Sequence, residues 1–182
     1  GAIDTMAFRD GLDPVMPHAS HRIDMLFVPA DPEAIWLPTG FEALCRTWQA
    51  RQWLSGDGPG PDVEALVPGG FSRVRLDEPG RMVLYANQQG GFQVRCPGTG
   101  GNIASAFGVA LGAWRHGAPR VMDCPDCGVE HLLDACILRP DGAFGRVALV
   151  LGDVNAITML AEGLQTIEEV MGPSRVVLRR VT

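Results

Sequence analysis

The sequence contains no lysine, and all 15 of its basic residues are arginines. This absence excludes the phosphate-binding P-loop, which requires a lysine behind its glycines. The 21 acidic residues outnumber the basic ones, so the formal net charge is −6. Nucleic-acid-binding domains usually carry a basic surface that neutralises phosphates. We therefore expect no nucleic-acid partner.

Long hydrophobic runs are also missing. No stretch of about 18 apolar residues occurs, and no basic segment followed by an apolar one stands near the beginning. We therefore expect no membrane partner. The preference for arginine, glycine and proline is typical of a GC-rich genome, and we interpret the chain as a bacterial cytoplasmic protein. Residues 1–20 are interpreted as an expression scar followed by an irregular arm.

The familiar catalytic motifs are absent. No nucleophile elbow, kinase signature or histidine-rich metal motif occurs. The glycine-rich loop behind Cys96 lacks the glycine of the dinucleotide fingerprint, because Ile103 stands in its place. Cys96 itself remains a candidate nucleophile, since the amino end of a following helix lowers the pKa of a thiol.

Hydrophobic periodicity predicts an α+β fold, a small mixed sheet with packed helices, because strands and amphipathic helices alternate at both ends of the chain. Hydrophobic residues make up 46% of the chain, which is enough for a globular core. Helices are predicted at 40–54, 103–114, 129–137 and 157–171, and strands at 22–28, 73–76, 82–86, 92–95, 147–151 and 175–181.

The expected organisation is one α+β domain over 21–182 that contains an insertion at 81–138. The insertion would comprise a β-hairpin, made by the strands at 82–86 and 92–95, and a cysteine-rich element. The glycine–proline run at 56–61 is the best candidate for a linker.

Two of the five cysteines stand in Cys124-Pro125-Asp126-Cys127-Gly128. A tight turn points two thiolates with this spacing at one tetrahedral zinc ion, and the glycine lets the backbone turn back. The frame recurs 28 residues earlier as Cys96-Pro97-Gly98-Thr99-Gly100, with threonine in place of the second cysteine. Each copy, or knuckle, follows a short apolar stretch.

The paired knuckles resemble the zinc-ribbon families, in which two such knuckles share one zinc ion. The resemblance covers about a quarter of the chain. It implies a zinc cofactor with Cys96, Cys124 and Cys127 as ligands. Thr99 departs from the pattern, because a neutral hydroxyl is a poor zinc ligand.

The fourth zinc ligand is therefore an open question. His131, four residues after Cys127 and expected on the first turn of a helix, is favoured over His116, and water or an empty position are the alternatives. A fourth protein ligand would make the site structural, and an open position would make it catalytic. A third interpretation is a relict frame that binds no metal.

Other conspicuous side chains are assigned to the core. Cys45 and Cys136 lie on apolar helical stripes and are expected to be buried small hydrophobes. Trp53 falls off its stripe and is expected to be partly exposed.

We interpret the protein as a non-enzymatic, adaptor- or inhibitor-like protein that binds another protein; the alternative is a small enzyme that uses Cys96 or an open zinc site. A homo-oligomer is compatible with either.

Overall fold

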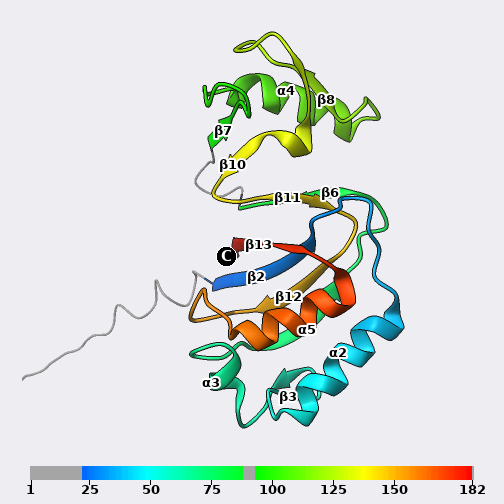
Figure 1. Cartoon of the computed structure of the whole chain (residues 1–182), viewed down its shortest axis with the longest axis vertical. Coiled ribbons are helices and arrows are strands. Elements are labelled where there is room, and N and C mark those ends of the chain that lie inside the picture. The colour runs from blue at the N-terminus through cyan, green and yellow to red at the C-terminus, as the bar shows by residue number, and fades with distance from the viewer. Residues whose placement is uncertain (1–21, 88–92, 182) are drawn as a thin grey trace, which may run out of the picture.

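The computed structural model describes residues 22–87 and 93–181, so the expected arm at 1–20 lies outside the described residues. A few helices are interspersed among a larger number of strands (Figure 1). In chain order they are β2 (Arg22–Pro29), α2 (Pro38–Ala50), β3 (Leu54–Ser55), β4 (Gly58–Pro59), α3 (Val63–Leu66), β5 (Arg73–Asp77), β6 (Val83–Tyr85), β7 (Gln93–Arg95), α4 (Ala104–Arg115), β8 (Val121–Asp123), β9 (Glu130–Leu132), the 3₁₀ turn η1 (Leu133–Ala135), β10 (Ile137–Arg139), β11 (Ala143–Gly145), β12 (Ala148–Gly152), α5 (Ala161–Met171) and β13 (Ser174–Val181).

The largest sheet has four strands in the order β13-β2-β12-β5, and all its neighbouring strands are antiparallel. It combines strands from both ends of the described chain, since Val181 of β13 lies opposite Arg22 of β2. Helices and antiparallel sheets together confirm the predicted mixed α+β fold. Within 22–87 and 93–181, no helix has the length and apolar character needed to cross a bilayer.

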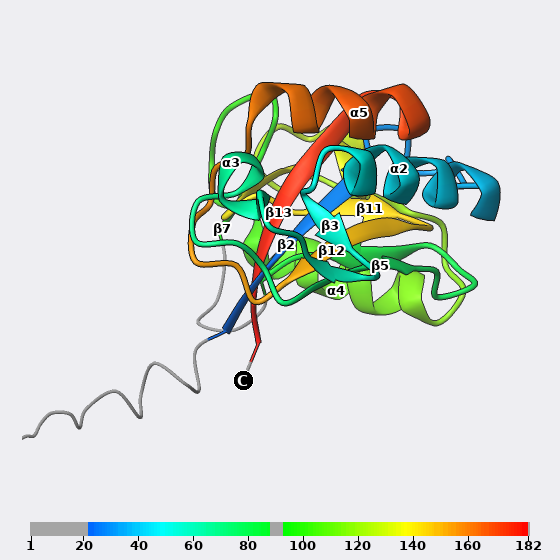
Figure 2. The same cartoon turned by 90° about the horizontal axis from the view of Figure 1, so that it is seen from below.

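The two central strands are apolar on both faces, because both faces of the sheet are covered. On one face, Met25 and Phe27 of β2 pack with Trp48 of α2 and Ile167 of α5. The Nε1 atom of Trp48 donates a hydrogen bond to Oγ1 of Thr166 at 2.8 Å, which gives the buried indole its partner. Helices α2 and α5 lie together on this side of the sheet (Figure 2).

The opposite face is covered by an antiparallel ribbon of β6 and β11. Because side chains alternate along a strand, the ribbon has two buried faces. Tyr85 and Ala143 pack on the sheet, and Leu84 and Phe144 pack on the residues beyond the ribbon. The ribbon therefore lies between the sheet and a further buried cluster.

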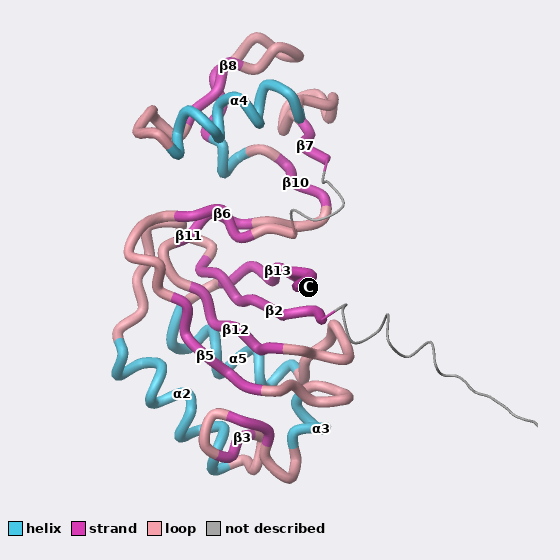
Figure 3. The backbone as a smooth tube through the Cα atoms, turned by 180° about the vertical axis from the view of Figure 1, so that it is seen from behind, coloured by secondary structure: helices cyan, strands magenta, loops and turns pink. Residues whose placement is uncertain are grey.

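That cluster belongs to residues 93–139, which we call the cysteine unit. It comprises α4, the pair β8–β9 and the pair β7–β10, and it lies on the far side of the β6–β11 ribbon from the sheet (Figure 3). Ile103 just before α4, Phe107 of α4 and Leu133 of η1 are almost fully buried in it. Glu33 ties the unit to the body of the protein, because its carboxylate pairs with both Arg120 and Arg146.

The predicted hairpin between 82–86 and 92–95 is wrong in its pairing. Both segments form strands, but β6 pairs with β11 and β7 pairs with β10. Each strand contains only three residues, so a local turn between them would bury little. The long-range partners instead let Leu84 enter the core of the cysteine unit.

The helix predicted at 129–137 is also wrong, because this segment is β9, η1 and the start of β10. Its apolar residues do not share one helical face: Val129 and Leu132 are 58% and 50% exposed, while Leu133 is buried. The run at 56–61 contains the turn of the small β3–β4 pair. Residues on both sides of it, such as Trp48 and Leu66, belong to one core between the main sheet and the helices α2 and α5, which we call the first core, so the run separates no domains. Trp53 is only 4% exposed, contrary to expectation, and packs edge-on against Trp48.

Candidate metal centre

The two knuckles have the same backbone geometry as well as the same sequence frame. In the first, the amide of Gly100 donates to the carbonyl of Cys96 at 2.8 Å; in the second, the amide of Gly128 donates to the carbonyl of Cys124 at 2.9 Å. Both glycines adopt the left-handed region, with φ of 77° and 75°. Residues that carry a Cβ atom disfavour this conformation. The last residue of each frame, Gly100 or Gly128, is therefore required by the turn.

Four side chains converge between the knuckles. The ligand atoms of Cys96, Cys124, Cys127 and His131 all lie within 4.8 Å of one another, and together they can hold a metal ion. The Nε2 atom of His131 lies 3.6 Å from the sulfur of Cys96 and 3.2 Å from the sulfur of Cys127. Cys96 and Cys124 are buried, and the other two are half-buried.

His131 reaches the cluster from a strand rather than from the helix that the sequence predicted. It lies on β9, opposite Met122 of β8, and β8 leads directly to Cys124. The β8–β9 pair therefore turns the chain back towards the second knuckle. His116 is not part of the cluster; it is exposed at the end of α4, and its Nδ1 atom lies 2.8 Å from the carbonyl of Gly112.

Thr99 occupies the position of the missing cysteine, but its hydroxyl is used to connect the two knuckles. It donates a hydrogen bond to Oδ2 of Asp126 in the second knuckle and accepts one from the amide of Gly101 at 3.1 Å. The Asp126 carboxylate lies so close to Gly101 that a Cβ atom there would be 2.3 Å from Oδ2. The sequence frame marks Thr99 as aligned with Cys127, but gives no sign of this contact.

The surroundings of the Cys96 thiol favour its thiolate form. Hydrogen bonding by the Thr99 side chain is the main cause that lowers its pKa to about 6, and the amides of Thr99 and Gly98 and the side chain of His131 act in the same direction against the desolvation. The Gly98 amide lies 3.3 Å from the sulfur. The Thr99 hydroxyl carries one proton, so it can donate a hydrogen bond either to this sulfur or to Asp126 at one time.

Repulsion from neighbouring sulfurs opposes ionisation of Cys127. A backbone hydrogen bond at Val129 lowers the pKa of Cys127, but desolvation and the neighbouring sulfurs of Cys96 and Cys124 outweigh it, so the pKa is raised overall. A bound cation would relieve this repulsion around Cys127.

The remaining two cysteines lie outside the cluster. Cys45 is half-buried on α2 and packs against the first core, and desolvation by burial raises its pKa. Cys136 is buried in the cysteine unit, where desolvation raises its pKa to about 11. Both agree with the expectation of packing residues.

Comparisons of the chain with protein-family models, with curated proteins and with solved structures find no match.

Proposed function

We propose that this is a non-enzymatic binding protein whose cysteine unit is held together by a structural zinc ion. Cys96, Cys124, Cys127 and His131 would be the ligands. The observation that carries the proposal is the complete set of four donor atoms within 4.8 Å of one another. Four protein ligands typify structural zinc sites, whereas catalytic sites use three and keep a position open.

The composition and spacing of the donors support zinc over other metals. Thiolate and imidazole ligands suit zinc, whereas magnesium and calcium prefer oxygen. Two donors of one tetrahedral zinc ion lie about 3.3–3.8 Å apart, given bonds of about 2.0–2.3 Å. The distances of 3.6 Å and 3.2 Å from His131 to the two sulfurs are close to this range.

Exposed apolar side chains on the cysteine unit support a role in binding another protein. Val109 of α4 is 76% exposed, Val129 just before β9 is 58% exposed, and Leu132 of β9 is 50% exposed. Such side chains gain most when a partner removes them from water. A small unit with this surface needs a rigid frame, and a zinc ion between the two knuckles would supply it.

Metal analysis of protein purified without chelator tests the zinc site. We expect about one zinc per chain in the wild type and little in Cys124→Ser, which should also loosen the cysteine unit while the sheet and α2 stay folded. Cys45→Ser is the matched control, since Cys45 lies in the other core, and it should keep its zinc. Wild-type protein with far less than one zinc per chain would contradict the proposal.

Partner binding is tested separately by crosslinking in cells of the source organism, followed by mass spectrometry. The double variant Val129→Asp, Leu132→Asp should lose any specific partner, because both side chains are exposed and can be changed without disturbing the core. Unchanged crosslinks in this variant would exclude this surface as the binding site.

A cysteine-dependent enzyme is the second candidate, because the pKa of Cys96 is lowered to about 6. Against it, Cys96 is fully buried, which leaves its sulfur no surface for a substrate. Alkylation by iodoacetamide separates the two functions. Rapid, selective modification of Cys96 in metal-loaded protein would favour the enzyme, and protection by the metal favours the structural site.

A further inference from the structure

The strand β13 is an edge of the main sheet, because it pairs with β2 only. In an antiparallel pair, the backbone groups of successive residues point alternately towards the partner strand and away from it. The amide of Ala30 donates to the carbonyl of Pro173 at 2.8 Å, so in this register the odd-numbered residues of β13 bond to β2. The even-numbered residues therefore present their amide and carbonyl groups to the free edge.

Three residues of this free edge have backbone groups that are available to another strand. The amide of Ser174 also points outwards, and the carboxylate of Glu168 accepts its hydrogen bond at 3.1 Å, which agrees with the alternation. In the part of the chain that the structure describes, the outward amide and carbonyl groups of Val176, Leu178 and Arg180 have no hydrogen-bonding partner. Such a row of donors and acceptors is a template for pairing with a further strand.

The opposite edge of the sheet is β5, and it differs from β13. The amide of Val74 in β5 donates to the carbonyl of Asp57 at 2.8 Å, and Asp57 lies in the turn between β3 and β4. The small β3–β4 pair therefore uses part of this edge. Of the two edges, β13 has the longer open row of backbone groups.

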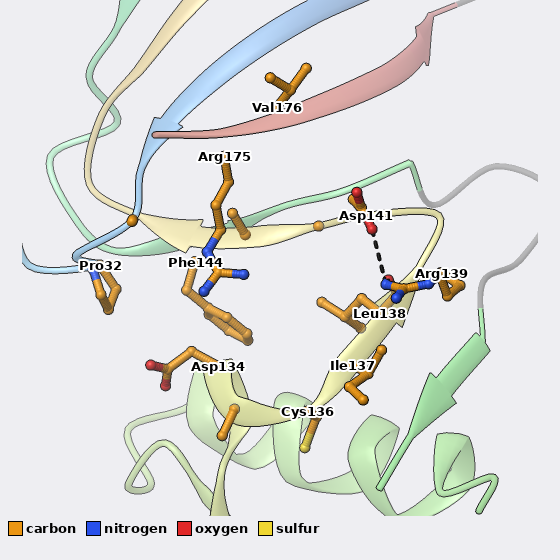
Figure 4. Close-up of a pocket in the computed structure, with 14 residues that line it drawn as sticks. Pro32, Asp134, Cys136, Ile137, Leu138, Arg139, Asp141, Phe144, Arg175 and Val176 are labelled. Atoms are coloured by element: carbon orange, nitrogen blue, oxygen red, sulfur yellow. Dashed lines mark hydrogen bonds and ion pairs between the residues drawn. The ribbon is translucent and has the colours of Figure 1, made fainter. Parts of the chain in front are cut away.

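A cavity of about 550 Å³ lies beside the start of β13. Arg175 and Val176 both border it, although their side chains point to opposite faces of the strand (Figure 4). Because successive side chains alternate between the two faces, a cavity that touches both residues lies along the edge of the strand. Residues of β10 and β11 form its far wall. There is therefore room for an added strand to begin beside Val176.

The edge strand is basic. It carries Arg175, Arg179 and Arg180 and no acidic residue. Arg175 and Arg180 are exposed and have no ion-pair partner among the described residues, while Arg179 lies 3.9 Å from a carboxylate oxygen of Asp24. Arg175 and Arg179 stand on the same face of the strand, because residues an even number of positions apart share a face.

The acidic groups across the cavity are already paired. Asp141 contacts Arg139 at 3.0 Å, as the dashed line in Figure 4 marks, and Asp134 contacts Arg120 at 2.8 Å. The arginines of β13 therefore keep their charge for a partner. An acidic strand beside β13 would form cross-strand pairs of opposite charge, whereas a second copy of β13 would bring three more arginines to the same place.

We propose that the free edge of β13 accepts an extended acidic segment of a partner protein as an additional strand. Backbone hydrogen bonds to Val176, Leu178 and Arg180 hold the segment, and acidic side chains at alternate positions pair with Arg175 and Arg179. In this mode of recognition the backbone supplies affinity and alternate side chains supply selectivity. The inference rests on the proposed binding role and names the kind of segment that is bound.

Calorimetric titration of the full chain with a capped eight-residue peptide of alternating glutamate and valine tests the proposal. In this register the glutamates lie beside Arg175 and Arg179, and the valines lie beside Val176 and Leu178 and direct their amides at β13. We expect saturable binding, and at least about tenfold weaker binding when the valine amides are N-methylated, because the charges stay and the hydrogen bonds are lost. Equal binding of both peptides would overturn strand addition, and no binding of the first would overturn the site.

Val176→Pro locates the contact, because it removes one outward amide and leaves the pairing with β2 intact. We expect about tenfold weaker peptide binding with an unchanged circular dichroism spectrum. The conservative variant Val176→Thr keeps the amide and the branched side chain, so it should retain the affinity within about twofold. Equal affinities of the two variants would overturn the role of this edge.

The charge of the segment is tested with Arg175→Gln, which should weaken binding about threefold. Arg46→Gln, at an exposed position of α2, is the matched control and should leave the affinity unchanged. An equal loss in both variants would show unspecific attraction and overturn the acidic segment.

Sedimentation of the wild type and of Val176→Pro tests the other occupant of the edge. Both should sediment as the same species. Self-association of the wild type that Val176→Pro abolishes would assign the edge to a second copy of the chain and overturn the proposal. Failure of the peptide to bind would leave the zinc content and the crosslinked partners of the wild type unchanged, so it is distinguishable from failure of the proposed function.

Discussion

Thr99 of the first knuckle donates a hydrogen bond to the carboxylate of Asp126 in the second. The residue that breaks the four-cysteine pattern thus joins the two knuckles directly. The fourth donor comes instead from His131 on β9. The change in the sequence frame therefore removes one sulfur and adds one contact between the knuckles.

This arrangement predicts that a cysteine at position 99 can replace the histidine. His131→Ala should lower zinc affinity by more than about 100-fold, because even partners of the ligands contribute about 10–100-fold. Adding Thr99→Cys should restore most of the affinity, because the shared frame places position 99 as Cys127 is placed in the second knuckle. Competition with a chromophoric chelator measures both effects.

His116→Ala is the control for this experiment, since His116 lies outside the cluster, and its zinc affinity should equal that of the wild type. If the double variant Thr99→Cys, His131→Ala bound zinc no better than His131→Ala, position 99 would not face the metal.

The low pKa of Cys96 predicts a pH-dependent stability in metal-free protein. Folding lowers this pKa from 9.0 to about 6. Between these values the unfolded chain binds the proton and the folded chain does not, so the contribution of Cys96 grows as pH rises. It is lost again as the pH falls through 6.

Denaturant unfolding with chelator present measures this effect as the difference between wild type and Cys96→Ser. We expect the difference in the free energy of unfolding to increase from pH 6 to pH 9. A difference independent of pH would show that the folded protein does not favour the Cys96 thiolate.

A side chain at Gly101 is predicted to displace the carboxylate of Asp126. A Cβ atom there would meet Oδ2 and Cγ of Asp126 at 2.3 and 2.7 Å. In Gly101→Ala the exposed carboxylate of Asp126 moves aside, so the main cost is the loss of its hydrogen bond with Thr99, about 0.5–1.5 kcal/mol. Thermal unfolding measures the loss.

Gly108→Ala is the matched control, because Gly108 lies inside α4 with open space at its Cβ position. It should raise stability by about 0.5–1 kcal/mol through the helix preference of alanine. Equal effects of the two substitutions would contradict the close contact at Gly101.

Thr166→Val should destabilise the first core without changing its volume. The hydroxyl of Thr166 is the hydrogen-bond acceptor for the fully buried indole of Trp48. Without it the Nε1 donor is unsatisfied, at a cost of about 1–3 kcal/mol in the free energy of unfolding. Thr47→Val, at an exposed position of α2, is expected to change stability by less than about 0.5 kcal/mol, and a similar loss in both would reject this account.

The sequence predicted the elements whose signals are local and strong. The apolar stripe of α5 and the continuous apolar runs of β2 and β12 follow from burial on one helix face and on both sheet faces. The pairing of β6 with β11 was not predicted, because the sequence of a three-residue strand does not indicate a pairing partner about 60 positions away. The segment 129–137 was misassigned because its leucines fit a helix and a strand–turn–strand equally well.

Part of the candidate site was likewise predictable from the sequence, and part was not. The repeated frame identified both knuckles, because the positive φ of Gly100 and Gly128 imposes a fixed residue at a fixed spacing. The choice between His131 and His116 depended on the β8–β9 pair, which sequence spacing did not reveal.

The β6–β11 ribbon has one more consequence, for protein engineering. Tyr85 lies opposite Ala143, so the chain departs for the cysteine unit and returns from it at neighbouring points. A tight two-residue turn at this place would close the ribbon as an ordinary hairpin. The cysteine unit is therefore joined to the rest of the chain at two neighbouring points, and a graft onto the tip of another antiparallel ribbon would have to carry Leu84 and Phe144 with it, because both belong to the core of the unit.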